Sequence, residues 1–233
     1  MKHLCAILAL WLLAAVPLQA SRSFVRASSQ YLRNASALAT PPMTFVCWYR
    51  TSNLTDTQCL FSLGVSTDDA LYLMFRGASG GDPFAAVAND AGVANAEATS
   101  AASGIVSGTW IHAGAIWAST TDRRVFVNGS KTTNATTVSA SGFNLTNLGR
   151  FEANGASTYT DGQLAEAGLW NVALSDDELT ALARGLSPLK VRPSALVEYW
   201  MLVGNTTNEI GAKGIQLTNG GSTKSQEHPR IYR

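Results

Sequence analysis

The stretch from Asp161 to Ser175, DGQLAEAGLWNVALS, joins a strand-like run to the start of a helix. Its first part, Gln163 to Trp170, is an apolar segment of strand length. Ser175 then stands where a helix would begin. The stretch therefore predicts a buried strand followed directly by a capped helix.

A short helix is predicted over residues 176–184. Ser175 is a natural N-cap and Glu178 follows three residues later, which is the spacing of a capping box. Three acidic residues lie in the first turn, at the positive end of the helix dipole. Gly185 ends the helix and Pro188 prevents its restart. We therefore assign these carboxylates a structural role.

Outside this stretch, short strand-like runs follow one another closely. Met43 to Arg50 has Phe45, Cys47 and Tyr49 on one face, as expected when alternate residues point to one side. Asn128-Gly129 between two alternating runs is a strong hairpin signal. Further strands are expected at residues 30–33, 58–64, 70–76, 109–117, 123–127, 131–138, 143–150, 195–202 and 215–217.

Composition agrees with an all-β chain that contains many turns. The sequence has 233 residues, of which 46% are hydrophobic and 14% charged, with 20 glycines. Residues 77–104 and 151–162 are rich in small and polar residues and are expected to form loops or weak edge strands. No repeat or linker divides the chain. Residues 21–233 are predicted to form one two-sheet antiparallel sandwich with a polar C-terminal tail.

Residues 1–20 have the pattern of a secretory signal peptide. Lys2 precedes an apolar run from Leu4 to Val16, and Ala20 is a small residue at the expected cut. The alternatives are an uncleaved anchor or a structural N-terminal arm. Cleavage would make the protein secreted or extracellular, and no later segment is long and apolar enough to span a membrane.

The charge balance argues against nucleic acid as a partner. The whole chain has a formal net charge of +1, from 17 basic and 16 acidic residues. Removing the leader removes Lys2 and no acid, which leaves 16 of each sign. No basic patch is dense enough for nucleic-acid binding.

Cys47 and Cys59 would remain after leader cleavage. They flank an expected hairpin loop at residues 51–55, and opposed residues on paired strands lie within reach of disulfide geometry. An exported protein would permit the bond. The alternative is two buried free thiols, because cysteine often serves as a small core residue.

Four ordered segments resemble the laminin-G-like, concanavalin A-like lectin/glucanase domain family. They are residues 23–24 with 30–32, residues 43–49, residues 108–112 with 125–129, and residues 161–175. The second contains an early tryptophan strand, the third a Trp-x-His strand and an Asn-Gly hairpin, and the fourth the strand that leads into the helix. The resemblance implies a jelly roll that binds carbohydrate, glycan or protein ligands. The acid common in the family before Glu166 is Ala165 here, which puts a role for that acid pair in doubt.

No catalytic residues are predicted. Glycosidases need a pair of carboxylates, one on each side of the scissile bond. No predicted strand carries two acids at suitable spacing. His112 lies within a core-like strand and is expected to be a packed, hydrogen-bonded imidazole. A serine nucleophile elbow, a phosphate loop and a Cys/His metal cluster are also missing from the sequence.

Candidate binding residues lie in the loops. Asp161 is the first candidate ligand for calcium, which prefers oxygen ligands, although no cofactor is required. Tyr159 and Phe84 are the candidate ligand-binding aromatics, because loops commonly carry binding residues. The tryptophans after the leader fall on predicted strands, and most are expected to be core residues.

The leading functional prediction is a secreted, non-catalytic module that recognises a carbohydrate, a surface glycan or a surface protein. One alternative is a structural or adhesive component of a virion or cell-surface assembly, in which the chain could form oligomers. The remaining alternative is a glycoside hydrolase whose acids the sequence pattern does not reveal. Fold likeness alone does not decide among them.

Overall fold

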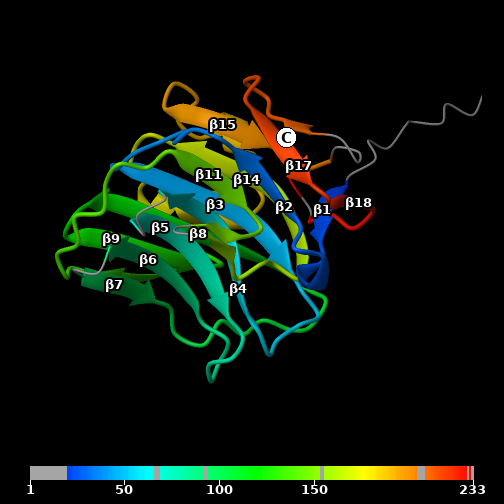
Figure 1. The fold of residues 1–233 in the computed structure, drawn as a ribbon, viewed down its shortest axis with the longest axis horizontal. Coiled ribbons are helices and arrows are strands. Elements are labelled where there is room, and N and C mark those ends of the chain that lie inside the picture. Colours follow the sequence, from blue (N-terminus) through cyan, green and yellow to red (C-terminus); the bar gives the residue numbers. More distant parts are fainter. Residues whose placement is uncertain are drawn as a thin grey trace, which may run out of the picture.

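The computed structural model describes residues 20–65, 69–91, 94–152, 155–203, 208–229 and 231. Apart from Ala20, the expected leader lies outside this range. The described chain forms two antiparallel sheets that stack face to face (Figure 1). This confirms the all-β, two-sheet jelly-roll sandwich with one short helix.

We call the first of these sheet 1. Its strands are β1 (Ser21–Phe24), β3 (Met43–Arg50), β8 (Trp110–Ser119), β9 (Asp122–Val127), β10 (Ser130–Asn134), β14 (Gly162–Trp170), β15 (Leu196–Trp200) and β18 (Thr223–Ser225). Their order is β10-β9-β8-β3-β14-β1-β18, and β15 also pairs with β14. The central strands β3, β8 and β14 match their predicted positions closely.

We call the opposite sheet sheet 2. Its strands are β2 (Tyr31–Asn34), β4 (Thr57–Gly64), β5 (Ala70–Arg76), β6 (Phe84–Asp90), β7 (Ala94–Thr99), β11 (Leu145–Leu148), β16 (Glu209–Ile210) and β17 (Gln216–Gly220). Their order is β16-β17-β2-β11-β4-β5-β6-β7. In Figure 1 the blue strands β1 and β2 lie beside the red strands β18 and β17, so both ends of the described domain meet.

The remaining elements are short. They are the pair β12 (Phe151–Glu152) and β13 (Ala156–Ser157), the helix α1 (Asp176–Ala183), and the 3-10 turns η1 (Arg26–Ser28) and η2 (Pro188–Lys190). No helix of the described residues has the length and apolar character needed to cross a membrane.

The main core fills the space between the sheets. Phe45 on β3 stacks on Phe61 on β4, with ring centroids 4.2 Å apart. Trp117 on β8 is buried and donates its indole N–H to the carbonyl of Val87 on β6 at 2.9 Å, which ties the two sheets together. Burial with a satisfied indole N–H is the usual state of a core tryptophan.

A second apolar cluster lies on the outer face of sheet 1, under α1. Leu179 and Leu182 of the helix pack there with Val46 and Trp170. The capping box is present: Glu178 N–H donates to Ser175 Oγ at 3.3 Å, and Ser175 N–H donates to Glu178 Oε2 at 2.7 Å. The helix prediction is therefore confirmed, with its end one residue earlier than expected.

The predicted Asn128-Gly129 hairpin is also confirmed. Val127 pairs with Ser130, which leaves a two-residue turn between β9 and β10. Asn128 and Gly129 have φ angles of 48° and 86°. Positive φ at both central positions defines the turn type that this dipeptide favours.

The hairpin predicted between β3 and β4 is wrong. The segment 51–56 crosses from sheet 1 to sheet 2 instead of pairing the two strands. Cys47 therefore points into the core between the sheets, whereas Cys59 lies in the cluster on the outer face of sheet 2. Both are buried free thiols, which is the second of the two expected alternatives, and the possible disulfide between them is not formed.

The assignment of residues 77–104 to loops or weak edge strands is only partly right. β7 is an edge strand, but β6 lies inside sheet 2, between β5 and β7. Phe84 begins β6, is fully buried, and packs against Tyr49 and Phe75. Phe84 is therefore a core residue and has no exposed ring for a ligand. The sequence pattern did not reveal β6 as a central strand because it is rich in small alanines.

The C-terminal tail packs onto its own domain. The side chain of His228 is buried, and its Nε2 lies 2.8 Å from Glu166 Oε1. The hydroxyl of Tyr199 donates to the other oxygen of the same carboxylate. Pro229 and Ile231 are also buried. The tail is therefore less polar in its contacts than its composition indicates.

Candidate functional site

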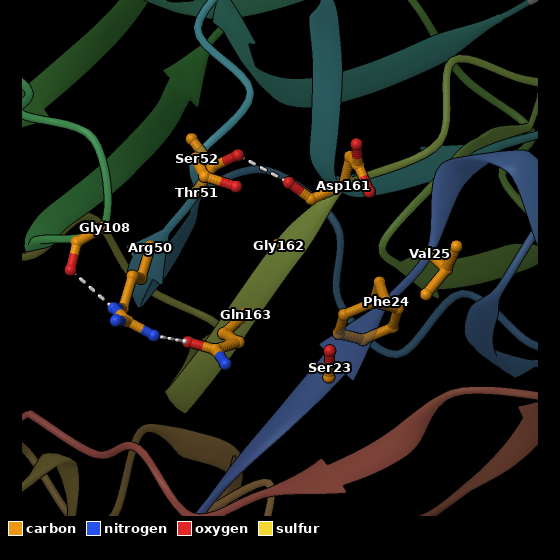
Figure 2. Close-up of a pocket in the computed structure, with 10 residues that line it drawn as sticks. All are labelled: Ser23, Phe24, Val25, Arg50, Thr51, Ser52, Gly108, Asp161, Gly162 and Gln163. Carbon is orange, nitrogen blue, oxygen red and sulfur yellow. Dashed lines mark hydrogen bonds between the residues drawn. The ribbon is translucent and has the colours of Figure 1, made fainter.

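Three neighbouring strands of sheet 1 leave a cleft at one end of the sandwich. β1 ends there, β3 ends there, and β14 begins there. The cleft has a volume of about 300 Å³. Figure 2 shows its lining residues: Ser23, Phe24, Val25, Arg50, Thr51, Ser52, Gly108, Asp161, Gly162 and Gln163. We call it the Arg50–Asp161 cleft.

Arg50 forms one wall of the cleft. Its Nε donates to the carbonyl of Gly108 at 2.6 Å and its Nη1 donates to Gln163 Oε1 at 2.7 Å (Figure 2). Among the described residues, no carboxylate lies within ion-pair distance of Arg50. The guanidinium is thus oriented by two neutral acceptors and keeps its positive charge uncompensated at the cleft.

Gln163 is held in place from both sides. Its Oε1 accepts the bond from Arg50, and its Nε2 donates to Ser225 Oγ on β18 at 2.8 Å. The two bonds also fix which end of the amide faces Arg50. Since both side chains are already oriented, a ligand would lose little freedom in ordering them.

Asp161 forms the rim at the far end of the cleft. Thr51 Oγ1 donates to the Asp161 carbonyl at 2.5 Å, and Asp161 N–H donates to Gln58 Oε1 at 2.7 Å. Asn53 Nδ2 donates to Asp161 Oδ2 at 3.1 Å and to Asp56 Oδ2 at 2.9 Å. The crossing segment 51–56 is therefore bound to the start of β14, and the rim is preorganised.

Gly162 lines the cleft at a point where β14 runs close to the end of β3. A Cβ added at Gly162 would lie only 2.3 Å from the Arg50 carbonyl oxygen. Any other residue would push the two strands apart at the base of the cleft. Glycine is therefore needed here for the close approach of two backbones.

The sequence located one part of this site. Asp161 lines the cleft, and Tyr159 is half-buried in the loop just before it, whereas Phe84 lies in the core. Arg50, Gln163 and Ser23 were missed as candidates. The available signal was an arginine that ends a strongly apolar strand and precedes a polar segment.

The calcium prediction has limited geometric support. Asp56 and Asp161 converge on one amide group, that of Asn53. Within the described ranges, no three side chains of His, Cys, Asp or Glu type gather closely enough to hold a metal ion. Calcium at Asp161 stays a prediction.

Part of the outer face of sheet 2 is covered by the chain itself. The segment that contains β12 and β13 lies over it: Ser62 Oγ donates to the Arg150 carbonyl at 3.0 Å, and the Phe151 ring meets Tyr72 edge-on at 4.8 Å. The Arg150 guanidinium stacks 3.4 Å above the ring of Tyr31. These contacts cover the part of this face around Tyr31, Ser62 and Tyr72.

Fold and cleft together define a lectin-type β-sandwich with a preorganised polar cleft at one end of its strands. The chain belongs to the concanavalin A-like lectin/glucanases superfamily, whose family model matches residues 26–180. No curated protein matches the sequence.

Solved structures share the fold at low sequence identity. A putative carbohydrate binding protein from Bacteroides ovatus matches with a TM-score of 0.65 and 18% identity; the match covers 92% of this chain and 61% of that chain. The Ruminococcus gnavus IT-sialidase CBM40 bound to α2,3 sialyllactose matches with a TM-score of 0.53 and 21% identity, and the match covers 63% of this chain and 84% of that chain. Domains LG4-5 of the mouse laminin α1 chain match with a TM-score of 0.51 and 18% identity, and the match covers 65% of this chain and 40% of that chain.

Proposed function

We propose that this chain is a secreted, non-catalytic carbohydrate-binding module and that its sugar site is the Arg50–Asp161 cleft. The observation that carries the proposal is the oriented but uncompensated guanidinium of Arg50. It lies in one cleft with the hydroxyl-bearing residues Ser23, Thr51 and Ser52 and the amide of Gln163. Sugars present hydroxyl groups, and charge-assisted hydrogen bonds to such groups are among the stronger polar contacts.

The similar structures support a sugar as the ligand. One is described as a putative carbohydrate binding protein, and another is a carbohydrate-binding module bound to sialyllactose. The positive charge of Arg50 would favour a saccharide that carries a carboxylate. The carboxylate of Asp161 at the opposite rim would accept hydrogen bonds from sugar hydroxyls.

The acids support a binding role rather than catalysis. Among the described residues, Asp161 is the only acidic one in the lining of the cleft, whereas glycoside hydrolysis requires two flanking carboxylates. The buried acids serve the fold. Glu198 accepts from the backbone N–H groups of Tyr199, Lys213 and Ile215, at 2.8, 2.7 and 2.6 Å respectively.

A glycan array followed by calorimetry tests the proposal. We expect Arg50→Ala to weaken binding of the best saccharide by about 10- to 100-fold, since a hydrogen bond to a charged group contributes about 1.5–3 kcal/mol. Arg184→Ala is the matched control, because Arg184 is an exposed arginine at the C-cap of α1, outside the cleft. Equal losses in both variants, or an unchanged Arg50→Ala, would contradict the site.

Calcium forms a separable part of the proposal. Asp161 and Asp56 would supply carboxylate oxygens, the ligand type that calcium prefers. Calorimetric titration of calcium should give a binding heat in the natural protein and none in Asp161→Asn. The same heat in both proteins would place any calcium elsewhere, and saccharide binding in the presence of EGTA would show that the cleft works without the ion.

Secretion is proposed from residues 1–20 alone. N-terminal sequencing of the exported protein should start at Ser21. An N-terminus at Met1 would show that the segment is retained.

A further inference from the structure

The five tryptophans of the described chain fall into two groups. Trp117, Trp170 and Trp200 are buried, and each donates its indole N–H to a backbone carbonyl at 2.8–2.9 Å. Trp48 and Trp110 are partly exposed and belong to none of the three apolar clusters. Within the described part of the chain, their indole N–H groups have no hydrogen-bond partner. Three of the five tryptophans are thus core residues, as expected for most of them, and these two are not.

Strand alternation places both of these tryptophans on the outer face of sheet 1. Ile111 and Ala113 of β8 lie in the core between the sheets, so Trp110 points outward. On β3, Cys47 and Tyr49 point inward, which places Trp48 outward. Val46 on the same outer face is covered by α1, whereas Trp48 and Trp110 lie beyond that covered part.

The strand register brings this pair next to the cleft. Arg50 pairs with Trp110 across β3 and β8, and with Gln163 across β3 and β14. Directly opposed residues on one sheet face have their Cβ atoms about 4.5–5.5 Å apart, and diagonal neighbours such as Trp110 and Trp48 about 7–8 Å. One row of side chains thus leads out of the cleft, from Gln163 through Arg50 to Trp110. Trp48 lies diagonally next to Trp110.

The orientation of Trp48 is set by a buried neighbour. His112 lies directly opposite Trp48, and the two rings meet edge-on with centroids 5.3 Å apart. His112 is 2% exposed, so it is a fixed wall against which the indole rests. A large, rigid and partly exposed ring with a free N–H suits a ligand that combines an apolar face with hydroxyl groups.

We propose that Trp110 and Trp48 extend the Arg50–Asp161 cleft into a platform that stacks the following sugar units, so that the natural ligand is an oligosaccharide or polysaccharide chain. This inference rests on the proposed function above and adds the ligand class to it. The first sugar occupies the cleft against Arg50 and Gln163. The next units lie with their apolar faces on the two indole rings, whose N–H groups donate to sugar hydroxyls.

Chain-length dependence of binding tests the platform. The probes are glucose, N-acetylglucosamine and sialic acid, each compared by calorimetry with its short oligomers or, for sialic acid, with sialyllactose. The natural protein should bind the longer form of at least one series tenfold or more tightly than the single sugar. Trp110→Ala and Trp48→Ala should lose that gain while binding of the single sugar stays unchanged, and Trp110→Phe should keep most of it.

Two comparison variants separate the outcomes. Arg50→Ala should weaken the binding of saccharides of every length. Tyr159→Ala should leave the affinity gain of the longer saccharides intact. Equal affinity for all lengths, with loss in Arg50→Ala, would uphold the cleft and overturn the platform. A gain that survives both Trp→Ala substitutions, or that depends on Tyr159, would also overturn it. If no saccharide of any length binds, the platform and the proposed function both fail.

Discussion

At the scale of single residues, His112 is the side chain most affected by its surroundings. It lies on β8 between Trp48 and the covered part of sheet 1, and its Nδ1 is buried without a hydrogen-bond partner among the described residues. Burial lowers the pKa of His112 from 6.5 to about 3. The imidazole is therefore neutral in the folded protein at physiological pH. It packs as expected, but the hydrogen bond predicted for it is missing at Nδ1.

This neutral histidine predicts a pH dependence of stability. Between pH 6.5 and about 3 the unfolded chain protonates His112 and the folded chain does not. The unfolded state then binds more protons, so stability falls as the pH is lowered through this window, by up to about 1.4 kcal/mol per pH unit. Urea unfolding of the natural protein and of His112→Leu at pH 6.5 and 5 measures it. An identical slope in both proteins would show that His112 titrates normally.

The two buried thiols give a second prediction at this scale. Burial raises the pKa of both Cys47 and Cys59 well above the ordinary thiol value. Because the thiolate is the reactive form, neither cysteine should react with iodoacetamide in the native protein, and both should react after denaturation without a reducing agent. Peptide mass spectrometry reads out each site. A disulfide-linked peptide pair that contains Cys47 and Cys59 would contradict the strand assignment.

At the scale of elements, the local signals in the sequence were strong. The alternation of Met43–Arg50, the Asn128-Gly129 turn and the Ser175 capping box each depend on neighbours within a few residues, and each was predicted. Whether consecutive strands pair or change sheets depends on packing across the whole sandwich. For that reason β3 and β4 were misassigned as a hairpin, and the alanine-rich β6 was missed.

The capping box should contribute measurably to stability. Ser175→Ala removes the acceptor for Glu178 N–H and should lower the free energy of unfolding by about 1 kcal/mol. The matched control is Asp177→Ala, which removes an exposed first-turn acid and leaves the box intact. Equilibrium urea unfolding measures both. A control that costs as much as Ser175→Ala would show that helix-dipole charge, rather than the cap, stabilises α1.

At the scale of the whole molecule, the site depends on segments far apart in the sequence. Ser23, Arg50, Gly108 and Asp161 meet because β1, β3 and β14 are neighbours in sheet 1. No local pattern could indicate that meeting, so the sequence yielded Asp161 as a single loop acid and did not reveal Arg50 opposite it. The platform was hidden for a related reason: strand periodicity places Trp48 and Trp110 on a face but does not show whether that face is covered.

A buried ion pair links the two sheets. Arg22 on β1 and Glu209 on β16 lie 3.1 Å apart, and both are almost completely buried. Breaking a buried ion pair by removing one member is strongly destabilising, so Glu209→Gln should destabilise the fold by about 3–5 kcal/mol. The double variant Arg22→Met with Glu209→Leu should recover a large part of this loss in urea unfolding. A double variant as unstable as the sum of both single variants would contradict the pairing.

The central claim concerns where the sugar lies, and a crystal structure of the protein with its tightest oligosaccharide tests that claim most directly. The structure should show one sugar in the cleft within hydrogen-bonding distance of Arg50 and Gln163, with the next unit over Trp110 (Figure 2). A saccharide bound instead on the outer face of sheet 2, near Tyr31 and Arg150, with the Arg50–Asp161 cleft empty, would contradict the account.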